Sequence, residues 1–219
     1  MPSPKLSFSR VQAYYTLHLP ISDYFRARRM RAFVETMQIR EGASVLDLGG
    51  GEEIWATVAT PLKVTILNLP GGSTPFVPSH HEFRHVVGDA CDLRLDGETR
   101  FDVVFSNSVL EHVGPEDKQE AFAREVRRLG TSYWIQTPSP WFPLECHTGL
   151  PFWFLYPKWL QEKFLRRWQR NLPQWAQYIR DTRVLSKRRM RELFPDAEIF
   201  VERTLGVPKS YTAWQRVER

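Results

Sequence analysis

The sequence predicts an α/β fold in which helices cover both faces of a mostly parallel sheet. Short apolar runs alternate along the chain with stretches of helical spacing, which is typical of parallel strands joined by helices. Polar residues stand at or next to the carboxyl ends of several runs, among them Asp47, Asn68 and Asp89. The first run, at residues 45–48, stops at three consecutive glycines, which make a turn without side chains. Because ligands of such sheets bind at the carboxyl ends of strands, this turn is the predicted binding corner.

The composition is that of an ordinary globular protein. The chain has 219 residues, of which 42% are hydrophobic and 25% charged, so we expect one domain with a substantial core. Its formal net charge of +5 is concentrated between residues 158 and 191. Cys91 and Cys146 have no metal-ligand spacing, which argues against a zinc site and favours a reducing compartment. We find no signal peptide and no run of about 20 apolar residues, and we therefore expect a cytoplasmic protein.

Two helices are expected before the first strand, in residues 1–42. One covers residues 11–19, and Ser22 caps the other. Apolar side chains recur at helical spacing in the second helix, at Met30, Phe33, Val34 and Met37. Its other face carries arginines that we expect to be solvated and not to bind an anion, Arg26, Arg28, Arg29 and Arg31.

After the glycines, predicted helices and strands alternate to the end of the chain. Strands are predicted at residues 64–69, 83–88, 101–106 and 132–136, with a closing hairpin at residues 198–204 and 210–215. Helices are predicted at residues 52–59, 115–129, 158–170 and 187–195. Pro115 suits the first turn of its helix, Gly130 ends that helix, and Ser186 caps the last one. Five strands and a hairpin make seven strands in all.

The glycine turn argues against a dinucleotide cofactor. A dinucleotide fingerprint has glycine at its first, third and sixth positions, whereas Ile54 stands at the sixth. Glu52 and Glu53 begin the next helix, where a pyrophosphate would bind and where two carboxylates repel it. A cofactor that has no phosphate and carries a sulfonium cation is compatible with these acids.

Three strings resemble the class I S-adenosylmethionine-dependent methyltransferases, in the bacterial small-molecule branch of the type 11 group. They are VLDLGGG at residues 45–51, GDACDL at residues 88–93 and FDVVFSNSVLEHVG at residues 101–114. The end of the chain, residues 193–213, resembles that family's closing strand pair more weakly. The resemblance implies a Rossmann-like, doubly wound sheet of seven strands with an antiparallel C-terminal strand. It also implies S-adenosyl-L-methionine as the cofactor.

Transferred to this sequence, the resemblance implies cofactor-binding residues at the ends of four strands. Asp47, Gly49 and Gly51 would line the methionine end, Asn68 would face the ribose, Asp89 and Ala90 the adenine, and Asn107 would close the pocket. Oxygen atoms of these residues can accept hydrogen bonds from ammonium, hydroxyl and amine groups. Two positions depart from the family, because Asn68 replaces an acid and Glu53 replaces a glycine. A neutral amide binds ribose more weakly than a carboxylate, so a binding module without turnover is the alternative to an enzyme.

Methyl transfer by direct displacement requires alignment, and it requires a base when the acceptor is a hydroxyl. His147 is the first candidate, because a neutral imidazole takes up a proton near pH 7, and His112 is the second. Glu145 would orient or replace either histidine. Each candidate also has a structural alternative: His112 as a core or capping residue, Glu145 and His147 as a solvent-facing pair, Asp47 as a brace of the turn, and Asp89 and Asn68 as turn residues.

Residues 140–183 are predicted to be an insertion that caps the acceptor site. Prolines and aromatic residues fill its first part, and a basic amphipathic helix follows at residues 158–170. We expect a small-molecule acceptor, such as a hydroxyl of a glycan, a lipid-linked sugar or a secondary metabolite. The helix is compatible with peripheral contact to an anionic membrane, although packing of its tryptophans on the domain is the simpler interpretation. A nucleic-acid substrate is disfavoured, because residues 107–110 lack the proline-aromatic signature of base methylation.

Overall fold

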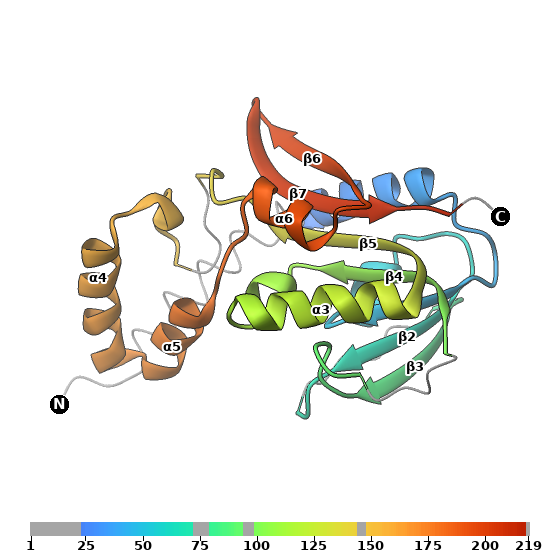
Figure 1. The fold of residues 1–219 in the computed structure, drawn as a ribbon, viewed down its shortest axis with the longest axis horizontal. Helices are drawn as coiled ribbons and strands as arrows, with labels where there is room; N and C mark the ends of the chain where they lie inside the picture. Colours follow the sequence, from blue (N-terminus) through green and yellow to red (C-terminus); the bar gives the residue numbers. More distant parts are fainter. Residues whose placement is uncertain (1–22, 72–78, 94–98, 144–147, 218–219) are drawn as a thin grey trace.

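Seven strands form one sheet in the part of the chain that the computed structural model describes, residues 23–71, 79–93, 99–143 and 148–217 (Figure 1). The strands are β1 (Ser44–Leu48), β2 (Lys63–Asn68), β3 (Glu82–Val87), β4 (Phe101–Asn107), β5 (Gly130–Pro138), β6 (Glu198–Thr204) and β7 (Val207–Gln215). Their order across the sheet is β3-β2-β1-β4-β5-β7-β6. Each predicted strand is present, with ends that differ by a few residues.

The sheet is parallel except at its C-terminal strands. β1 pairs in parallel with β2 and β4, and the same direction continues through β3 and β5. β7 runs antiparallel between β5 and β6, so the closing hairpin enters the sheet by its second strand. These pairings confirm the predicted α/β fold with an antiparallel C-terminal strand. The strand order reverses between β1 and β4, which is where ligands of open α/β sheets bind.

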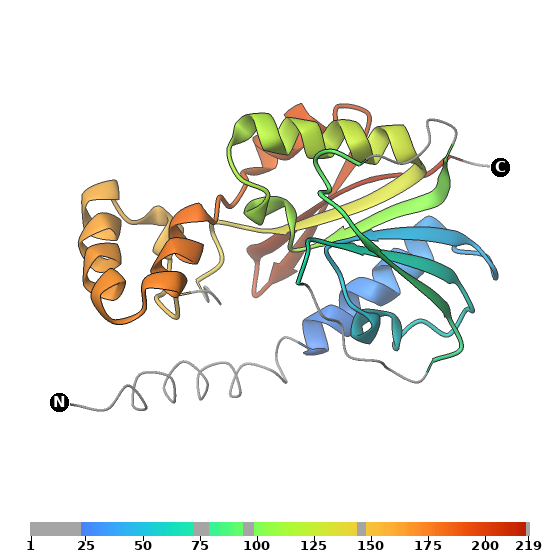
Figure 2. The ribbon, with the colours of Figure 1, turned by 90° about the horizontal axis from the view of Figure 1, so that it is seen from below.

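Helices cover both faces of the sheet. They are the helix of residues 23–37, α2 (Glu52–Trp55), α3 (Glu116–Leu129) and α6 (Lys187–Leu193), with a single-turn 3-10 helix, η1 (Leu110–His112). α3 and α6 pack on one face, where Phe122, Val126 and Met190 are buried. The helix of residues 23–37 and α2 pack on the other face (Figure 2). There the rings of Phe33 and Trp55 meet edge to face. The predicted helix at residues 11–19 and its neighbour's cap Ser22 lie outside the described residues.

Two helix ends were predicted from their capping residues and one helix was predicted too long. The Gly130 N–H donates to the carbonyl of Val126 at the end of α3, and Ser186 Oγ accepts from the N–H of Arg189 at the start of α6. The prediction of a helix up to residue 59 was wrong, because α2 ends at Trp55. The N–H of Val58 bonds to Trp55 O, which is an i to i−3 contact that closes a turn instead of continuing the helix.

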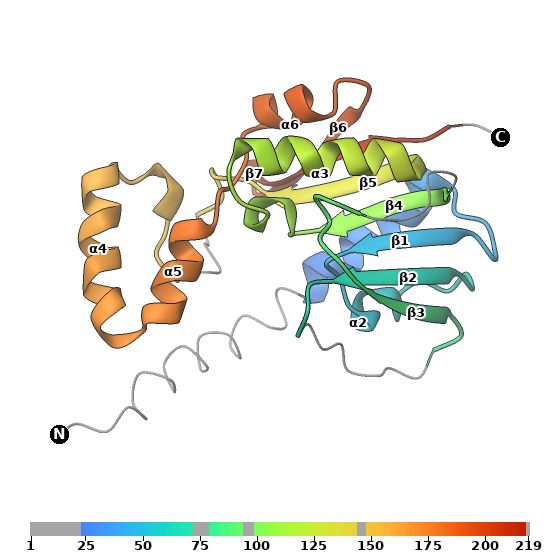
Figure 3. The same ribbon diagram turned by 60° about the horizontal axis from the view of Figure 1, so that its bottom comes forward.

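Two further helices, α4 (Lys158–Asn171) and α5 (Pro173–Asp181), lie beside the sheet. A 3-10 helix, η2 (Trp153–Leu155), precedes them. We call residues 153–182, which contain these three elements, the α4–α5 arm. Figure 3 shows this arm beyond the ends toward which the parallel strands point. The arm has its own apolar cluster around Trp153, Leu165 and Ile179. α4 confirms the predicted basic helix, whereas α5 was not predicted. No helix in the described ranges is both long and apolar enough to span a membrane.

Candidate active site

The carboxyl end of β1 leads into a turn that has no room for side chains. Gly49 adopts a positive φ of 78°, and a Cβ on it would lie 2.7 Å from a methyl group of Val109. A Cβ on Gly50 would lie 2.0 Å from Asp47 Oδ2. The backbone therefore passes directly against the buried carboxyl group of Asp47, and only glycine fits at Gly50 without displacing that group.

Asp47 is fully buried at the floor of this turn. Its Oδ2 accepts a hydrogen bond from Trp55 Nε1 at 2.9 Å, and its Oδ1 has no hydrogen-bond partner among the described residues. Burial raises the pKa of Asp47 from 3.8 to about 7; the Trp55 bond opposes this shift, and Glu53 adds to it. A buried carboxyl group with one unused oxygen is suited to a cationic ligand, which would stabilise its ionised form. The prediction that Asp47 braces the turn also fits, through the bond to Trp55.

A cavity of about 240 Å³ opens above Asp47. It is lined by Arg26, Asp47, Gly49, Gly50, Gly51, Glu53, Ile54, Phe105 and Asn107. The cavity brings together four of the predicted cofactor residues, from the ends of β1 and β4. It also contains Arg26, which the sequence analysis assigned to a solvated face. Arg29 is not solvated either, because it lies 3.6 Å from the buried Glu202.

The two acids after the glycines have different surroundings. Glu52 is buried, and its Oε1 lies 2.8 Å from His85 Nε2 of β3. Glu53 lines the cavity above Asp47. Of the two acids predicted to repel a pyrophosphate, Glu52 therefore pairs with His85, and of the two only Glu53 lines the cavity where a cofactor would lie.

Asn68, at the end of β2, contacts the glycine turn directly. Its amide Nδ2 donates to the carbonyl of Gly50 at 3.0 Å, which leaves its Oδ1 as an acceptor. This contact joins β2 to the turn after β1, so Asn68 has a structural role in addition to any contact with a ligand.

Asp89 follows β3 and acts as a turn residue. Its Oδ1 accepts from the backbone N–H of Cys91 at 2.8 Å, and Lys118 Nζ lies 3.5 Å from Oδ2. The N–H of Cys91 is the main reason that the pKa of Asp89 is lowered. The carboxylate remains about half exposed, so the predicted turn cap and contact with an adenine amine are compatible. Ala90 lies next to it and packs against the core on the α3 face.

His112 ends η1, at the same edge of the sheet, and contacts the α4–α5 arm. Its ring stacks on Tyr178 with centroids 4.9 Å apart, and Thr182 Oγ1 lies 3.3 Å from its Nδ1. The imidazole is 23% exposed and lies beside the fully buried Glu111. The other catalytic candidates, Glu145 and His147, lie outside the described residues.

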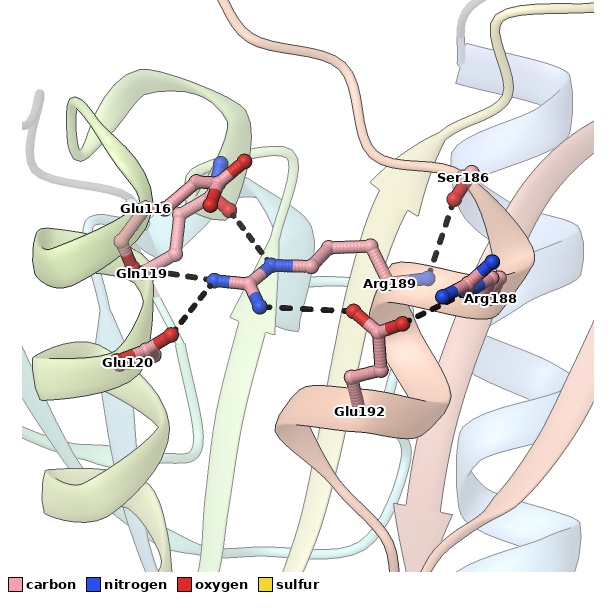
Figure 4. Close-up of polar contacts among 7 residues, drawn as sticks. All are labelled: Glu116, Gln119, Glu120, Ser186, Arg188, Arg189 and Glu192. Carbon is pink, nitrogen blue, oxygen red and sulfur yellow. Dashed lines mark hydrogen bonds and ion pairs between the residues drawn. The ribbon is translucent and has the colours of Figure 1, made fainter.

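Two larger cavities lie away from this edge. One of about 440 Å³ is bordered by residues 37–43 and by Arg216, beyond the amino ends of β1 and β4. Another of about 470 Å³ lies between α3 and α6. Arg189, which lines it, is already paired with acids on both helices: it lies 3.2 Å from Glu120 of α3 and 3.6 Å from Glu192 of α6 (Figure 4). Arg189 thus joins α3 to α6, and this role requires no ligand.

Sequence reasoning missed residues that depend on long-range contacts. Arg26 lies on a helix remote in sequence from the glycine turn, and only the fold brings it to the cavity. Tyr178 lies on the unpredicted α5 and Thr182 directly follows it, 66 and 70 residues after His112. Pro173 at the first turn of α5 was a usable signal for that helix.

Residues 46–131 match the sequence profile of a family described as "Methyltransferase domain". Comparison with curated proteins gives no match. Among solved structures, the chain is similar to magnesium protoporphyrin IX methyltransferase from Synechocystis PCC 6803 with bound SAH. That likeness has 14% identity and a TM-score of 0.53 over 96% of this chain and 94% of the other.

Two further solved structures are similar. The N-terminal domain of EvdMO1, in the presence of SAH and D-fucose, has 19% identity and a TM-score of 0.51 over 88% of this chain and 83% of the other. A methyltransferase of Haloferax volcanii, in complex with the activator Trm112, has 16% identity and a TM-score of 0.50 over 95% of both chains. At these identities the likenesses establish the fold. Together with the profile match over residues 46–131 and the glycine turn, they are consistent with a class I methyltransferase, the class whose methyl donor is S-adenosylmethionine.

Proposed function

We propose that the protein transfers a methyl group from S-adenosylmethionine to a hydroxyl of a small-molecule acceptor, such as a glycan, a lipid-linked sugar or a secondary metabolite. The observation that carries the proposal is the cavity lined by both the buried carboxyl of Asp47 and the guanidinium of Arg26. When bound, S-adenosylmethionine supplies an electrophilic methyl group on a sulfonium centre.

The residues of the cavity fit the methionine end of this cofactor. Its ammonium group would pair with Asp47, whose Oδ1 has no hydrogen-bond partner among the described residues. Its carboxylate would pair with Arg26, which recognises carboxylates through a planar set of donors. Gly49 and Gly51 leave the space between these two charges free of side chains.

The ends of β2 and β3 supply acceptors for the remainder of the cofactor. Asn68 keeps Oδ1 available for a ribose hydroxyl while its amide holds the glycine turn. The half-exposed carboxylate of Asp89 can accept from the adenine amine, next to Ala90. The amide of Asn68 replaces the charge that the family usually has there, so the ribose contact contributes less binding free energy.

For a hydroxyl acceptor, we propose His112 as the general base among the described residues. Its imidazole is partly exposed at the carboxyl edge of the sheet, and the carboxylate of Glu111, 3.9 Å from Nε2, stabilises the imidazolium formed by proton uptake. His147 and Glu145 remain the candidates from the loop after β5. The role of the protein is to align the acceptor, exclude water and accept the proton.

We propose residues 140–183 as the cap of the acceptor site. Several of their aromatic rings are more than two-fifths exposed, at Trp141, Phe152 and Tyr178, although burial is usual for side chains of this size. Exposed rings at the mouth of a site suit a sugar ring or another largely apolar acceptor.

The outer face of α4 is the proposed site of peripheral contact with an anionic membrane. Trp159, which is 69% exposed, stands in line with exposed Lys163, Arg166 and Arg170 along the helix. The apolar face of α4 packs inside the arm around Leu165, so contact with lipid would be electrostatic, through these cations. We expect sedimentation with vesicles containing phosphatidylglycerol at low salt, and its loss in a Lys163→Glu/Arg170→Glu variant. Equal recovery of both proteins in the supernatant would disprove the contact.

Methyl transfer is tested in two stages. Calorimetry with S-adenosylhomocysteine should give one site per chain, and absence of binding by a folded sample would disprove the enzyme. Methyl-labelled S-adenosylmethionine is then incubated with a panel of sugar nucleotides, lipid-linked sugars and phenols, and the labelled product is examined for an O-methyl ether. Binding of the cofactor without transfer to any hydroxyl would favour the alternative, a binding module that has lost turnover.

A further inference from the structure

The α4–α5 arm contacts His112 at both nitrogens of its ring. Thr182 Oγ1 lies 3.3 Å from Nδ1, and the Tyr178 hydroxyl lies 3.1 Å from Nε2. The phenol ring is nearly parallel to the imidazole, with an interplanar angle of 18°. The C-terminal end of α5 and the residue that follows it, Thr182, therefore fix the plane of the ring and meet both of its nitrogens.

The contacts of Thr182 determine which nitrogen of His112 carries the proton. Its hydroxyl has a single hydrogen, which it donates to the carbonyl of Tyr178 at 2.9 Å. Toward Nδ1 the same oxygen can then only accept, so Nδ1 must carry a hydrogen. In a neutral imidazole the other nitrogen, Nε2, is consequently the basic one.

We infer that Thr182 and Tyr178 are positioning residues that hold His112 as the Nδ1–H tautomer, so that the α4–α5 arm sets the basic nitrogen of the reaction. The inference rests on the proposed role of His112 as general base. The arm would thus have two roles, to cap the acceptor and to fix the tautomer of the base His112.

The chemistry of proton uptake is consistent with this arrangement. When the acceptor oxygen takes the methyl group, the methyl–sulfur bond would break with its electron pair left on sulfur, the acceptor O–H bond would break, and the proton would move to Nε2 of His112. His112 becomes an imidazolium whose Nδ1–H still donates to Thr182. Among the described residues, the groups beside Nε2 are the carboxylate of Glu111 on η1, at 3.9 Å, and the phenol hydroxyl of Tyr178 on α5, at 3.1 Å. Because the Tyr178 hydroxyl occupies Nε2, either the acceptor hydroxyl displaces it, or Tyr178 donates its own proton to Nε2 and accepts the proton of the acceptor.

The tautomer can be measured without an acceptor. Long-range ¹H–¹⁵N correlation spectra of the labelled protein distinguish protonated from unprotonated ring nitrogens, and a His112→Gln spectrum assigns the signal among the six histidines. In the wild-type protein above pH 7.5, Nδ1 should be the protonated nitrogen. Thr182→Val removes the acceptor and should populate the Nε2–H form, whereas Thr182→Ser keeps the oxygen and should restore the wild-type spectrum.

Activity provides the second readout. Thr182→Val should lower kcat about 10- to 100-fold, which is at or below the lower end of what general-base catalysis contributes because the base is misoriented and not removed, with KM for the cofactor unchanged and kcat restored by Thr182→Ser. Tyr178→Phe keeps the stacked ring and should have a smaller effect than Tyr178→Leu. An Nε2–H tautomer in the wild-type protein, or a spectrum unaffected by Thr182→Val, would overturn the inference and leave methyl transfer untouched. Failure to bind S-adenosylhomocysteine would instead disprove the proposed function, without altering the tautomer result.

Discussion

The glycine turn and the α4–α5 arm lie at the same edge of the sheet but are built in different ways. Asp47, the glycines and Trp55 lie within nine residues of one another, and the buried carboxyl and indole are bonded directly. The arm is held by its own small cluster around Trp153 and reaches the sheet through η1, where the Arg183 N–H bonds to Glu111 O. The turn is part of the main core, whereas the arm is a separate unit attached to it.

This difference separates two parts of the proposed reaction. Cofactor binding would depend on the buried corner, where the carboxyl group of Asp47 is held in an unfavourable environment. Acceptor binding and the orientation of the base would depend on the arm, which has fewer contacts with the sheet. Substitutions in the corner should therefore abolish cofactor binding, and substitutions in the arm should leave it intact.

The largest effect is expected from Gly50→Ala. The new methyl group would lie 2.0 Å from Asp47 Oδ2, so the carboxyl must move and lose its bond to Trp55. Affinity for S-adenosylhomocysteine, measured by calorimetry, should fall more than about 100-fold, as expected when a charge-assisted contact and its geometry are both lost. Gly206→Ala is the control for a strained glycine substitution outside the cavity lining: a Cβ there meets nothing within 4 Å, and its cost is the backbone strain of a φ of 80°. Wild-type affinity in both variants would contradict the role of the turn.

Asp47→Asn should stabilise the protein without cofactor in a pH-dependent way. The pKa of Asp47 is raised from 3.8 to about 7 in the folded protein, so its protonated form favours folding below pH 3.8, and this contribution is lost as the pH rises through 7. At pH 8 the ionised carboxylate of Asp47 then lowers the free energy of unfolding by about 4 kcal/mol, by the usual conversion of a pKa shift to free energy. Urea unfolding should show the variant gaining on the wild type between pH 4 and pH 8. The pKa of Asp89 is lowered, so the Asp89 carboxylate stabilises the fold at neutral pH and this contribution is lost in acid; the stability of Asp89→Asn relative to the wild type should therefore rise as the pH falls, the opposite of Asp47→Asn. A difference between Asp47→Asn and the wild type that does not depend on pH would contradict the assignment.

Trp153→Ala should loosen the arm and spare the corner. Trp153 is buried against Phe164 and Trp168, and large-to-small substitutions of this type cost about 3–5 kcal/mol. Limited proteolysis should cleave the variant within residues 153–182, and methyl transfer should be lost. Affinity for S-adenosylhomocysteine should stay within about threefold of the wild type, a change of less than 1 kcal/mol. Loss of cofactor binding here would show that the two regions are not independent.

The smallest effect is expected from Arg26→Gln, which removes one charge from the wall of the cavity. Arg26 is partly exposed, so its contact with a carboxylate is screened, and we expect about tenfold weaker binding of S-adenosylhomocysteine. Arg28→Gln is the matched control on the exposed side of the same helix. Equal affinities in the two variants would remove Arg26 from the site.

The corner could be predicted from the sequence because its determinants are local. A run of apolar residues, an acid and three glycines define a strand and a turn through short-range sterics, and the neighbouring strands follow the same pattern. The capping residues Ser186 and Gly130 marked helix ends for the same reason. Helix propensity predicted a helix up to residue 59, but α2 ends at Trp55, where the N–H of Val58 closes a turn on the carbonyl of Trp55.

The arm and its contacts could not be predicted in the same way. Whether Tyr178 meets His112 depends on how α5 folds back over a separation of 66 residues, which no local pattern encodes. Arg26 gave the same signal as Arg28, and only the packing of their helix on the sheet distinguishes the residue in the cavity from the exposed one. Sequence periodicity assigns residues to faces of a helix but does not say what each face meets.

The most direct test of the corner is the pH dependence of S-adenosylhomocysteine binding. If the ammonium group pairs with ionised Asp47, whose pKa is about 7 without ligand, affinity measured by calorimetry should rise about tenfold from pH 6 to pH 8. Asp47→Asn should bind weakly and with no such rise. Binding by the wild-type protein that is equally tight at pH 6 and pH 8, or no binding at either pH by a folded sample, would contradict the account.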